Sequence, residues 1–316
     1  MQAHIQGIHH ITAIAGDPQK NIDFYCGVLG LRMVKKTINF DAPDVYHFYF
    51  GDRVGTPGTV FTTFPFKGAR KGTKGVGEVQ YTAFSIPKGS LDFWRARVKR
   101  FGFPISDTLT RFGEAYIRFE DHDGMGIELI EASEDARVGW GEGPVPEEYA
   151  IKGFYGATLT LRSREATVKL LTGFMNYRFI AEENGRYRYG TAGRPGDIVD
   201  IVEQPEGRTG VQSAGSVHHI AFRTADGSSQ REIQGILHAN GYSVTEVKDR
   251  NYFTSIYFRE PGGVLFEIAT DTPGFAIDED EALLGEALKL PGWAEKHRDK
   301  IEESLHPVTL DYSAYV

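Results

Sequence analysis

Two pairs of adjacent histidines are the groups in this sequence that could most readily do chemistry. They are His9 and His10 in the segment GIHHITAIA, and His218 and His219 in the segment SVHHIAFR. A carboxylate that could join them is Glu267, in the segment LFEIAT. Two neutral imidazoles and one carboxylate form the set that holds non-haem Fe(II) and leaves metal positions open for other ligands. These residue types therefore indicate a metal site for Fe(II), with Mn(II) as the alternative.

Strand alternation selects which histidine of each pair can reach such a site. Successive side chains of a strand point to opposite faces, so only one member of each pair can face a common centre. His219 shares its face with the small Ala221, whereas His218 shares its face with bulky apolar residues that suit packing on a helix. The inferred ligands are His10, His219 and Glu267. The first histidine of each pair is expected to point away, unless a bulge reverses it.

The elements that would position these residues recur four times along the chain. VQYTAF at 79–84 resembles VHHIAF at 217–222, and GMGIELIEA at 124–132 resembles GGVLFEIAT at 262–270. Weaker copies begin near residues 8 and 155. Each copy reads as a strand, a helix, and then two or three strands with period-2 alternation. We therefore predict an α+β protein built of four βαβββ units.

The predicted units span about 6–66, 77–132, 153–204 and 215–271. They form an N-terminal domain over 1–145 and a C-terminal domain over 146–271, followed by an extension over 272–316. The helices are expected over 17–30, 90–102, 163–176 and 229–241, with another over 293–304 in the extension. We expect this extension to be a strap rather than a lid.

Curved units with open edges must pair, so four units should make two cups. The inferred ligands come from the first and fourth units, which should therefore share one cup. The second and third units carry Tyr81 and Ala157 where the fourth carries His219. Glu128 aligns with Glu267 but has no histidines beside it, which favours a structural role.

Composition limits the classes of partner and compartment. The 316 residues are 41% hydrophobic, and 35 basic against 43 acidic residues give a net charge of −8. This balance argues against nucleic acid or an anionic membrane as partner. The sequence has one cysteine, Cys26, no long apolar run and no leader pattern, so we expect a soluble cytoplasmic protein. A homo-oligomer is left open.

The long segments around these residues resemble a known family. GIHHITAIAGDPQKNIDFYCGVLGLRMVKKTINFD and DRNYFTSIYFREPGGVLFEIATDTPGF are similar to the vicinal-oxygen-chelate superfamily, which includes glyoxalase I, bleomycin-resistance proteins and extradiol dioxygenases. The likeness is greatest to the ring-cleaving dioxygenases of hydroquinone and chlorohydroquinone. It implies the same three metal ligands, a small aromatic substrate and O2. It also implies supporting roles in catalysis for Tyr257, Arg250, Thr12, His9 and His218.

Physical roles can be assigned to two of these residues. The Tyr257 hydroxyl could hydrogen-bond a substrate phenolate, and the Arg250 guanidinium could stabilise negative charge on the ring. The expected activity is therefore that of a non-haem Fe(II) extradiol-type dioxygenase of hydroquinone-like, or alternatively catechol-like, aromatics.

Two rival functions are compatible with the same fold. A glyoxalase-like isomerase or lyase would use a fourth protein ligand from the last strand of the first unit, but that strand reads GTVFTTFPF and holds no carboxylate. A metal-free resistance protein that sequesters small molecules would not need His10, His219 and Glu267 together.

Overall fold

The strands of the protein form two curled sheets. The computed structural model describes residues 5–316, and its strands make two eight-stranded sheets. In spatial order the first sheet consists of β14 (Lys248–Asp249), β15 (Phe253–Arg259), β16 (Leu265–Pro273), β13 (Ser216–Thr224), β1 (Ile8–Ala15), β4 (Val60–Pro65), β3 (Ala42–Gly51) and β2 (Arg32–Asn39). The second consists of β10 (Arg178–Glu183), β11 (Arg186–Gly190), β12 (Ile198–Glu203), β9 (Gly153–Leu161), β5 (Glu78–Ile86), β8 (Gly126–Glu131), β7 (Glu114–Glu120) and β6 (Leu109–Arg111).

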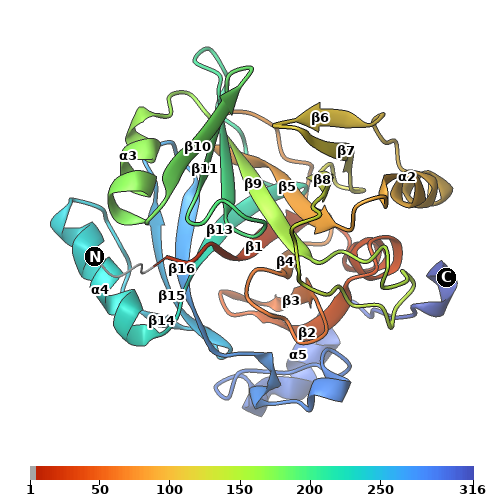
Figure 1. The fold of residues 1–316 in the computed structure, drawn as a ribbon. Coiled ribbons are helices and arrows are strands. Elements are labelled where there is room, and N and C mark those ends of the chain that lie inside the picture. Colours follow the sequence, from red (N-terminus) through yellow and green to blue (C-terminus); the bar gives the residue numbers. More distant parts are fainter. Residues whose placement is uncertain (1–4) are drawn as a thin grey trace.

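This strand order confirms the predicted α+β fold and the pairing of its units. The first and fourth units build one sheet, and the second and third build the other (Figure 1). Each sheet is joined at its centre by the opening strands of its two units, β1 with β13 and β5 with β9, which run antiparallel. Each sheet therefore takes one unit from each of the two predicted domains. The boundaries of those domains stay a prediction.

The helices occupy the predicted positions; four are shorter than expected, and the fourth along the chain is shifted by two residues. They are α1 (Pro18–Ile22), α2 (Leu91–Arg100), α3 (Glu165–Phe174), α4 (Gly227–Ala239) and α5 (Arg298–Ser304). α1 begins at Asp17, whose carboxylate accepts from the amides of Gln19 and Lys20, and it continues as a π-helix over Asp23–Val28. α4 begins earlier than expected because Asp226 caps it, not Ser229. The Asp226 carboxylate accepts from two amides of the first turn and so satisfies donors that have no partner within the helix.

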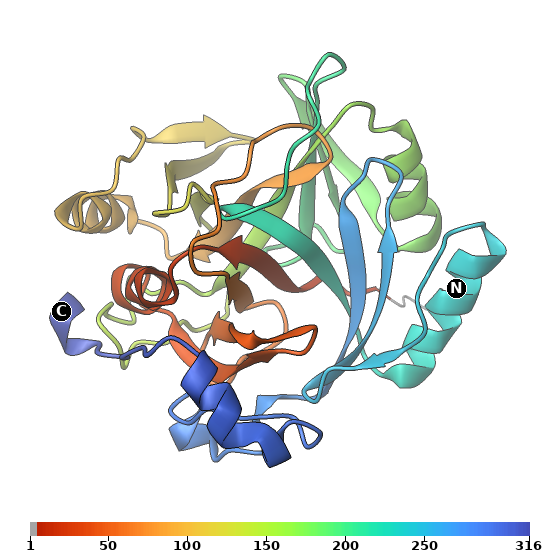
Figure 2. The ribbon, with the colours of Figure 1, turned by 180° about the vertical axis from the view of Figure 1, so that it is seen from behind.

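The C-terminal extension is a strap along the edge of the first sheet. It contains short 3-10 helices over Phe275–Ile277, Glu281–Leu283, Glu295–His297 and Ser313–Tyr315, besides α5. The Lys289 amide donates to the Lys36 carbonyl at 2.9 Å, which covers β2, an edge strand. The extension lies against the orange-red strands of the first unit (Figure 2). The buried ammonium group of Lys35 fastens it by ion pairs to Asp278, at 2.6 Å, and to Glu279.

None of the helices within residues 5–316 is both long and apolar enough to cross a membrane.

The second cup buries Glu128 among arginines. Glu128 on β8 pairs in register with Arg118 on β7, as Glu267 on β16 pairs with Tyr257 on β15. Arg111 and Arg118 donate to the two carboxylate oxygens of Glu128 at 2.5 and 2.6 Å. Burial alone would raise the pKa of Glu128, but these two guanidinium groups lower it overall. Glu128 is therefore held by ion pairs in the place where the first cup holds Glu267.

We expect Glu128→Gln to lower the free energy of unfolding by about 3 kcal/mol at pH 7, because it removes the carboxylate that pairs with the buried guanidinium of Arg111 and the partly buried one of Arg118. Because the pKa of Glu128 is lower in the folded than in the unfolded protein, its charge stabilises the fold at any pH above the unfolded-state pKa. This stabilisation is lost as the pH falls through the folded-state pKa. The variant should therefore lose less stability on acidification than the wild type. Urea unfolding measures both effects. Glu120→Gln, at the exposed end of β7, is the control and should change stability by less than about 0.5 kcal/mol. Equal stability of both variants would contradict the role of Glu128.

Candidate metal centre

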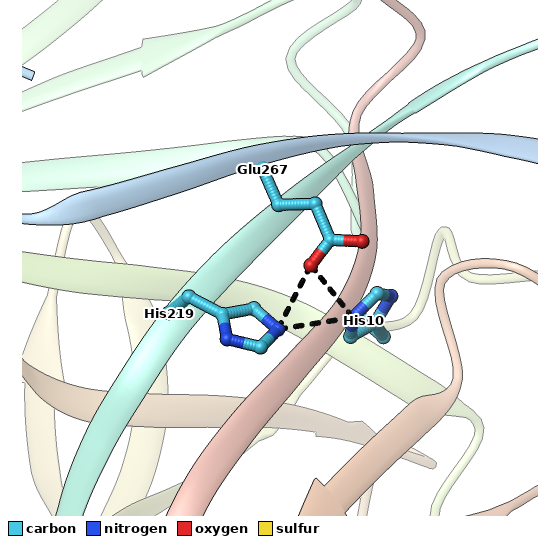
Figure 3. A group of neighbouring side chains, drawn as sticks. All are labelled: His10, His219 and Glu267. Carbon is cyan, nitrogen blue, oxygen red and sulfur yellow. Dashed lines mark hydrogen bonds and ion pairs between the residues drawn. The ribbon is translucent and has the colours of Figure 1, made fainter. Parts of the chain in front are cut away.

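Three potential ligand atoms meet in the first cup. The Nε2 atoms of His10 and His219 lie 3.3 Å apart, and Glu267 Oε2 lies 2.9 Å from His219 Nε2 and 3.4 Å from His10 Nε2. The three side chains are buried and point toward one another from β1, β13 and β16 (Figure 3). The structure thus brings together the three residues that alternation selected. It does so because these strands are neighbours, with His10 opposite Ala221, and Ala221 opposite Glu267.

The neighbouring histidines fix the orientation of both imidazoles. His9 Nδ1 lies 2.9 Å from His10 Nδ1, and His218 Nδ1 lies 2.8 Å from His219 Nδ1. Such a contact needs one Nδ1 donor and one Nδ1 acceptor, and a metal ligand at His10 Nε2 requires His10 Nδ1 to be the donor and His9 Nδ1 the acceptor. This assignment leaves the Nε2 lone pair of His10 directed at the centre. A ligand histidine whose second nitrogen is bonded in this way is typical of metal sites.

The first histidine of each pair does not point away as expected. Irregularities in the pairing of β1 with β13, between Ile8 and His10 and between Thr12 and Ala13, break the strict alternation. His9 consequently packs against His10, and His218 lies in the wall of a cavity beside His219. Burial is the main cause that lowers the pKa of His9, and it lowers the pKa of His218 to about 3. The neighbouring histidine of each pair lowers the pKa further. Both are neutral at pH 7 and can accept a hydrogen bond.

Ser255 orients the carboxylate of Glu267. Its hydroxyl donates to Glu267 Oε1 from the adjacent strand β15. The other oxygen, Oε2, is buried and faces only the Nε2 atoms of His219 and His10 among the described residues. Burial alone would raise the pKa of Glu267, yet His10 and His219 hold it well below its usual range. A buried carboxylate oxygen and two imidazole nitrogens with unshared lone pairs need a cation between them, so this donor set fits a divalent transition metal.

The centre borders a cavity of about 300 Å³, near the lower end of small-molecule sites. Residues of the first and fourth units form its wall. Its apolar side chains are Ile14, Phe40, Phe64, Phe66 and Phe253, and its polar ones are His10, Asn39, Asp41, His47, Tyr49, His218, His219, Arg250 and Tyr257. Aromatic walls around a few polar groups suit a small planar ligand.

Arg250 and Tyr257 form a polar pair in this wall. Arg250 Nε donates to the Tyr257 hydroxyl oxygen at 3.1 Å, which leaves the hydroxyl proton of Tyr257 free for another acceptor. The Tyr257 ring lies edge-on to that of His219, with 5.8 Å between the centroids. Burial and the charge of Glu267 raise the pKa of Tyr257, so it is a neutral donor at pH 7. Arg250 also reaches Asp41 at 3.9 Å.

Thr12 lies behind the cavity wall. It is fully buried, and its hydroxyl lies 2.8 Å from that of Thr62 on β4. Thr62 in turn lies 2.9 Å from His47 Nε2, on β3. Thr12 is therefore joined to the cavity wall through hydrogen bonds, and it lies two residues after the candidate ligand His10 on β1.

Sequence reasoning missed Ser255, His47 and Tyr49. In the segment VYHFYF the signal was a polar pair, His47 and Tyr49, alternating with buried Phe48. Ser255 gave a weaker signal, since it shares a strand face with Tyr257. Neither sequence pattern tells which residues face these side chains in the folded protein.

Comparisons with known proteins extend these observations. The sequence profile of the "Glyoxalase/Bleomycin resistance protein/Dioxygenase superfamily" matches residues 7–129 and 148–268. "Putative ring-cleaving dioxygenase MhqO" of Bacillus subtilis is 48% identical over 307 residues, which cover 97% of this chain and 98% of that protein. "Chlorohydroquinone/hydroquinone 1,2-dioxygenase" of Sphingobium indicum is 35% identical, over 97% and 98% of the two chains.

Solved structures agree with this likeness. A crystal structure described as a "putative dioxygenase" from Bacillus subtilis superposes with a TM-score of 0.94 at 47% identity, over 98% of this chain and 99% of the other. Maize glyoxalase I superposes with a TM-score of 0.62 at 15% identity, over 84% of this chain and 92% of the other, and therefore shares the fold alone. The chain belongs to the glyoxalase, bleomycin-resistance protein and dioxygenase superfamily, and its full-length relatives place it among the ring-cleaving dioxygenases of that family.

Proposed function

We propose that this chain is a non-haem Fe(II) dioxygenase of the extradiol type that opens the ring of hydroquinone-like aromatics with O2. The observation that carries the proposal is the convergence of His10, His219 and Glu267 on one buried point beside a cavity with aromatic walls. Mn(II) is the alternative metal, because it also accepts imidazole and carboxylate ligands. The names of the relatives support a hydroquinone as the substrate class.

The residues around the centre suit this chemistry. When bound, Fe(II) supplies the one-electron chemistry that lets an aromatic ring react with O2. Tyr257 donates its free hydroxyl proton to an oxygen of the substrate, and Arg250 stabilises negative charge that develops on the ring. Phe64, Phe66 and Phe253 pack on the ring faces and exclude water.

The geometry favours this activity over the glyoxalase-like isomerase. The last strand of the first unit, β4, carries Thr62 and Phe64 beside the site and no carboxylate. A metal with three protein ligands keeps more coordination positions free for an aromatic hydroxyl and O2 than a metal with four protein ligands.

Removal of one ligand should abolish both metal binding and activity. We expect protein loaded anaerobically with Fe(II) to hold one iron per chain and to consume O2 with methylhydroquinone. His219→Ala should lose the iron and the O2 uptake together, because two ligands cannot hold the metal at that affinity. His238→Ala, in the exposed last turn of α4, is the control and should keep both. Full iron content with normal turnover in His219→Ala would disprove the metal site.

Ser255→Ala should weaken metal binding without removing a ligand, because Glu267 Oε1 loses the donor that orients it. Loss of such a supporting hydrogen bond lowers metal affinity by about 10- to 100-fold. Titration with Fe(II) against a competing chelator measures the change. Ser85→Ala replaces a buried serine of the second sheet and should bind iron like the wild type. Equal affinities in the two variants would show that Ser255 does not orient the ligand.

Tyr257→Phe should separate turnover from metal binding. It removes a hydroxyl that touches no ligand atom, so the iron content should stay at the wild-type value. Turnover of methylhydroquinone should fall by at least about 100-fold if this hydroxyl donates during the reaction. Steady-state O2 uptake gives the measurement. An unchanged kcat would remove Tyr257 from the proposed reaction.

A further inference from the structure

A second polar group lies at the cavity, on two strands that carry none of the three candidate ligands. His47 and Tyr49 on β3 line the cavity, and Thr62 on β4 is hydrogen-bonded to His47. The Tyr49 hydroxyl lies 2.9 Å from His47 Nδ1, and His47 Nε2 lies 2.9 Å from the Thr62 hydroxyl. The rings of His47 and Tyr49 are 4.0 Å apart between centroids. This polar group is not used by the chemistry proposed above.

The Tyr49 hydroxyl retains hydrogen-bonding capacity for a ligand. Burial and the nearby histidines lower the pKa of His47, and burial raises that of Tyr49, so both are neutral at pH 7. A neutral imidazole has one donor and one acceptor nitrogen, and both are engaged here. A hydroxyl can donate one hydrogen bond and accept two, and the bond to His47 uses only one of these three possibilities. Tyr49 can therefore bind one more neutral polar group, and His47 holds it in place.

The position of this group suits the far side of an aromatic ring. β3 is two strands away from β1, which carries His10, so the two backbones lie about 10 Å apart along the sheet. Apolar surface lies next to the pair, with the Phe64 ring 4.4 Å from that of His47. Because His10 and Tyr49 line the same cavity from strands that are not adjacent, a ring with one oxygen at the candidate ligands can extend across the cavity toward Tyr49. The adjacent ring position would instead stay near the metal ligands.

We propose that Tyr49, positioned by His47, binds the hydroxyl para to the metal-bound oxygen and so selects para-dihydroxylated rings over catechols. This inference rests on the proposed function. It assigns Tyr49 as a specificity residue that touches substrate and His47 as a positioning residue. A catechol or a simple phenol gains nothing from the pair, because neither presents a hydroxyl at that edge.

Binding without turnover tests the inference. Iron-loaded protein is titrated under anaerobic conditions with hydroquinone, phenol and catechol, followed by calorimetry. Tyr49→Phe should weaken hydroquinone binding by about three- to tenfold, the usual worth of one hydrogen bond, and should leave phenol and catechol within about twofold. His47→Leu should give the same selective loss, because Tyr49 then has no partner to orient it. Tyr46→Phe, a buried tyrosine of the same strand outside the cavity wall, should change none of the three.

The wild type alone provides a second readout, which does not depend on the folding of a variant. Hydroquinone should bind it more tightly than phenol does. Equal affinities for hydroquinone and phenol, or equal losses for both ligands in Tyr49→Phe, would overturn the inference. If the wild type cleaves hydroquinone while either of these results holds, only the role of Tyr49 fails. If the iron-loaded wild type neither binds nor cleaves hydroquinone, the proposed function fails and this inference fails with it.

Discussion

The candidate site depends on one contact, the antiparallel pairing of β1 with β13. These strands belong to opposite halves of the chain, and the candidate ligands that they carry, His10 and His219, are 209 residues apart. β16 pairs with β13 in parallel and adds Glu267 to the same face. Removing either half would take away at least one of the three candidate ligands. Bringing together strands that are so far apart in sequence costs conformational entropy. The apolar surface that the same pairing buries offsets this cost.

The two cups satisfy the same electrostatic requirement in different ways. Each buries a glutamate at the equivalent register position, where an unpaired carboxylate would be costly. In the second cup Arg111 and Arg118 neutralise Glu128 through ion pairs. In the first, no arginine or lysine among the described residues forms an ion pair with Glu267, whose Oε2 faces the Nε2 atoms of His10 and His219. The missing charge in the first cup is the physical reason to expect a cation there and not in the second.

Alternation and repetition predicted the fold, the pairing of units and the three ligand candidates, because both signals depend on a regular period along the chain. They failed where the period breaks. The irregular pairing of β1 turned His9 toward His10, and no residue type announces such a bulge. His47 and Tyr49 were missed for another reason: only the curl of the sheet brings β3 to the cavity that His10 and His219 also line. That proximity depends on tertiary structure.

The C-terminal extension shows how a segment outside the repeat can matter to the site without lining it. Phe275 of the extension packs on Tyr49 and Tyr252, with 5.1 Å between ring centroids in both pairs. The ion pairs of buried Lys35 hold the following turn of the extension in place. Tyr49 is therefore fixed from behind by packing and at its hydroxyl by His47. A hydroxyl can discriminate between ring positions only if its ring cannot move, so the packing of the extension on Tyr49 supports the role proposed for that residue.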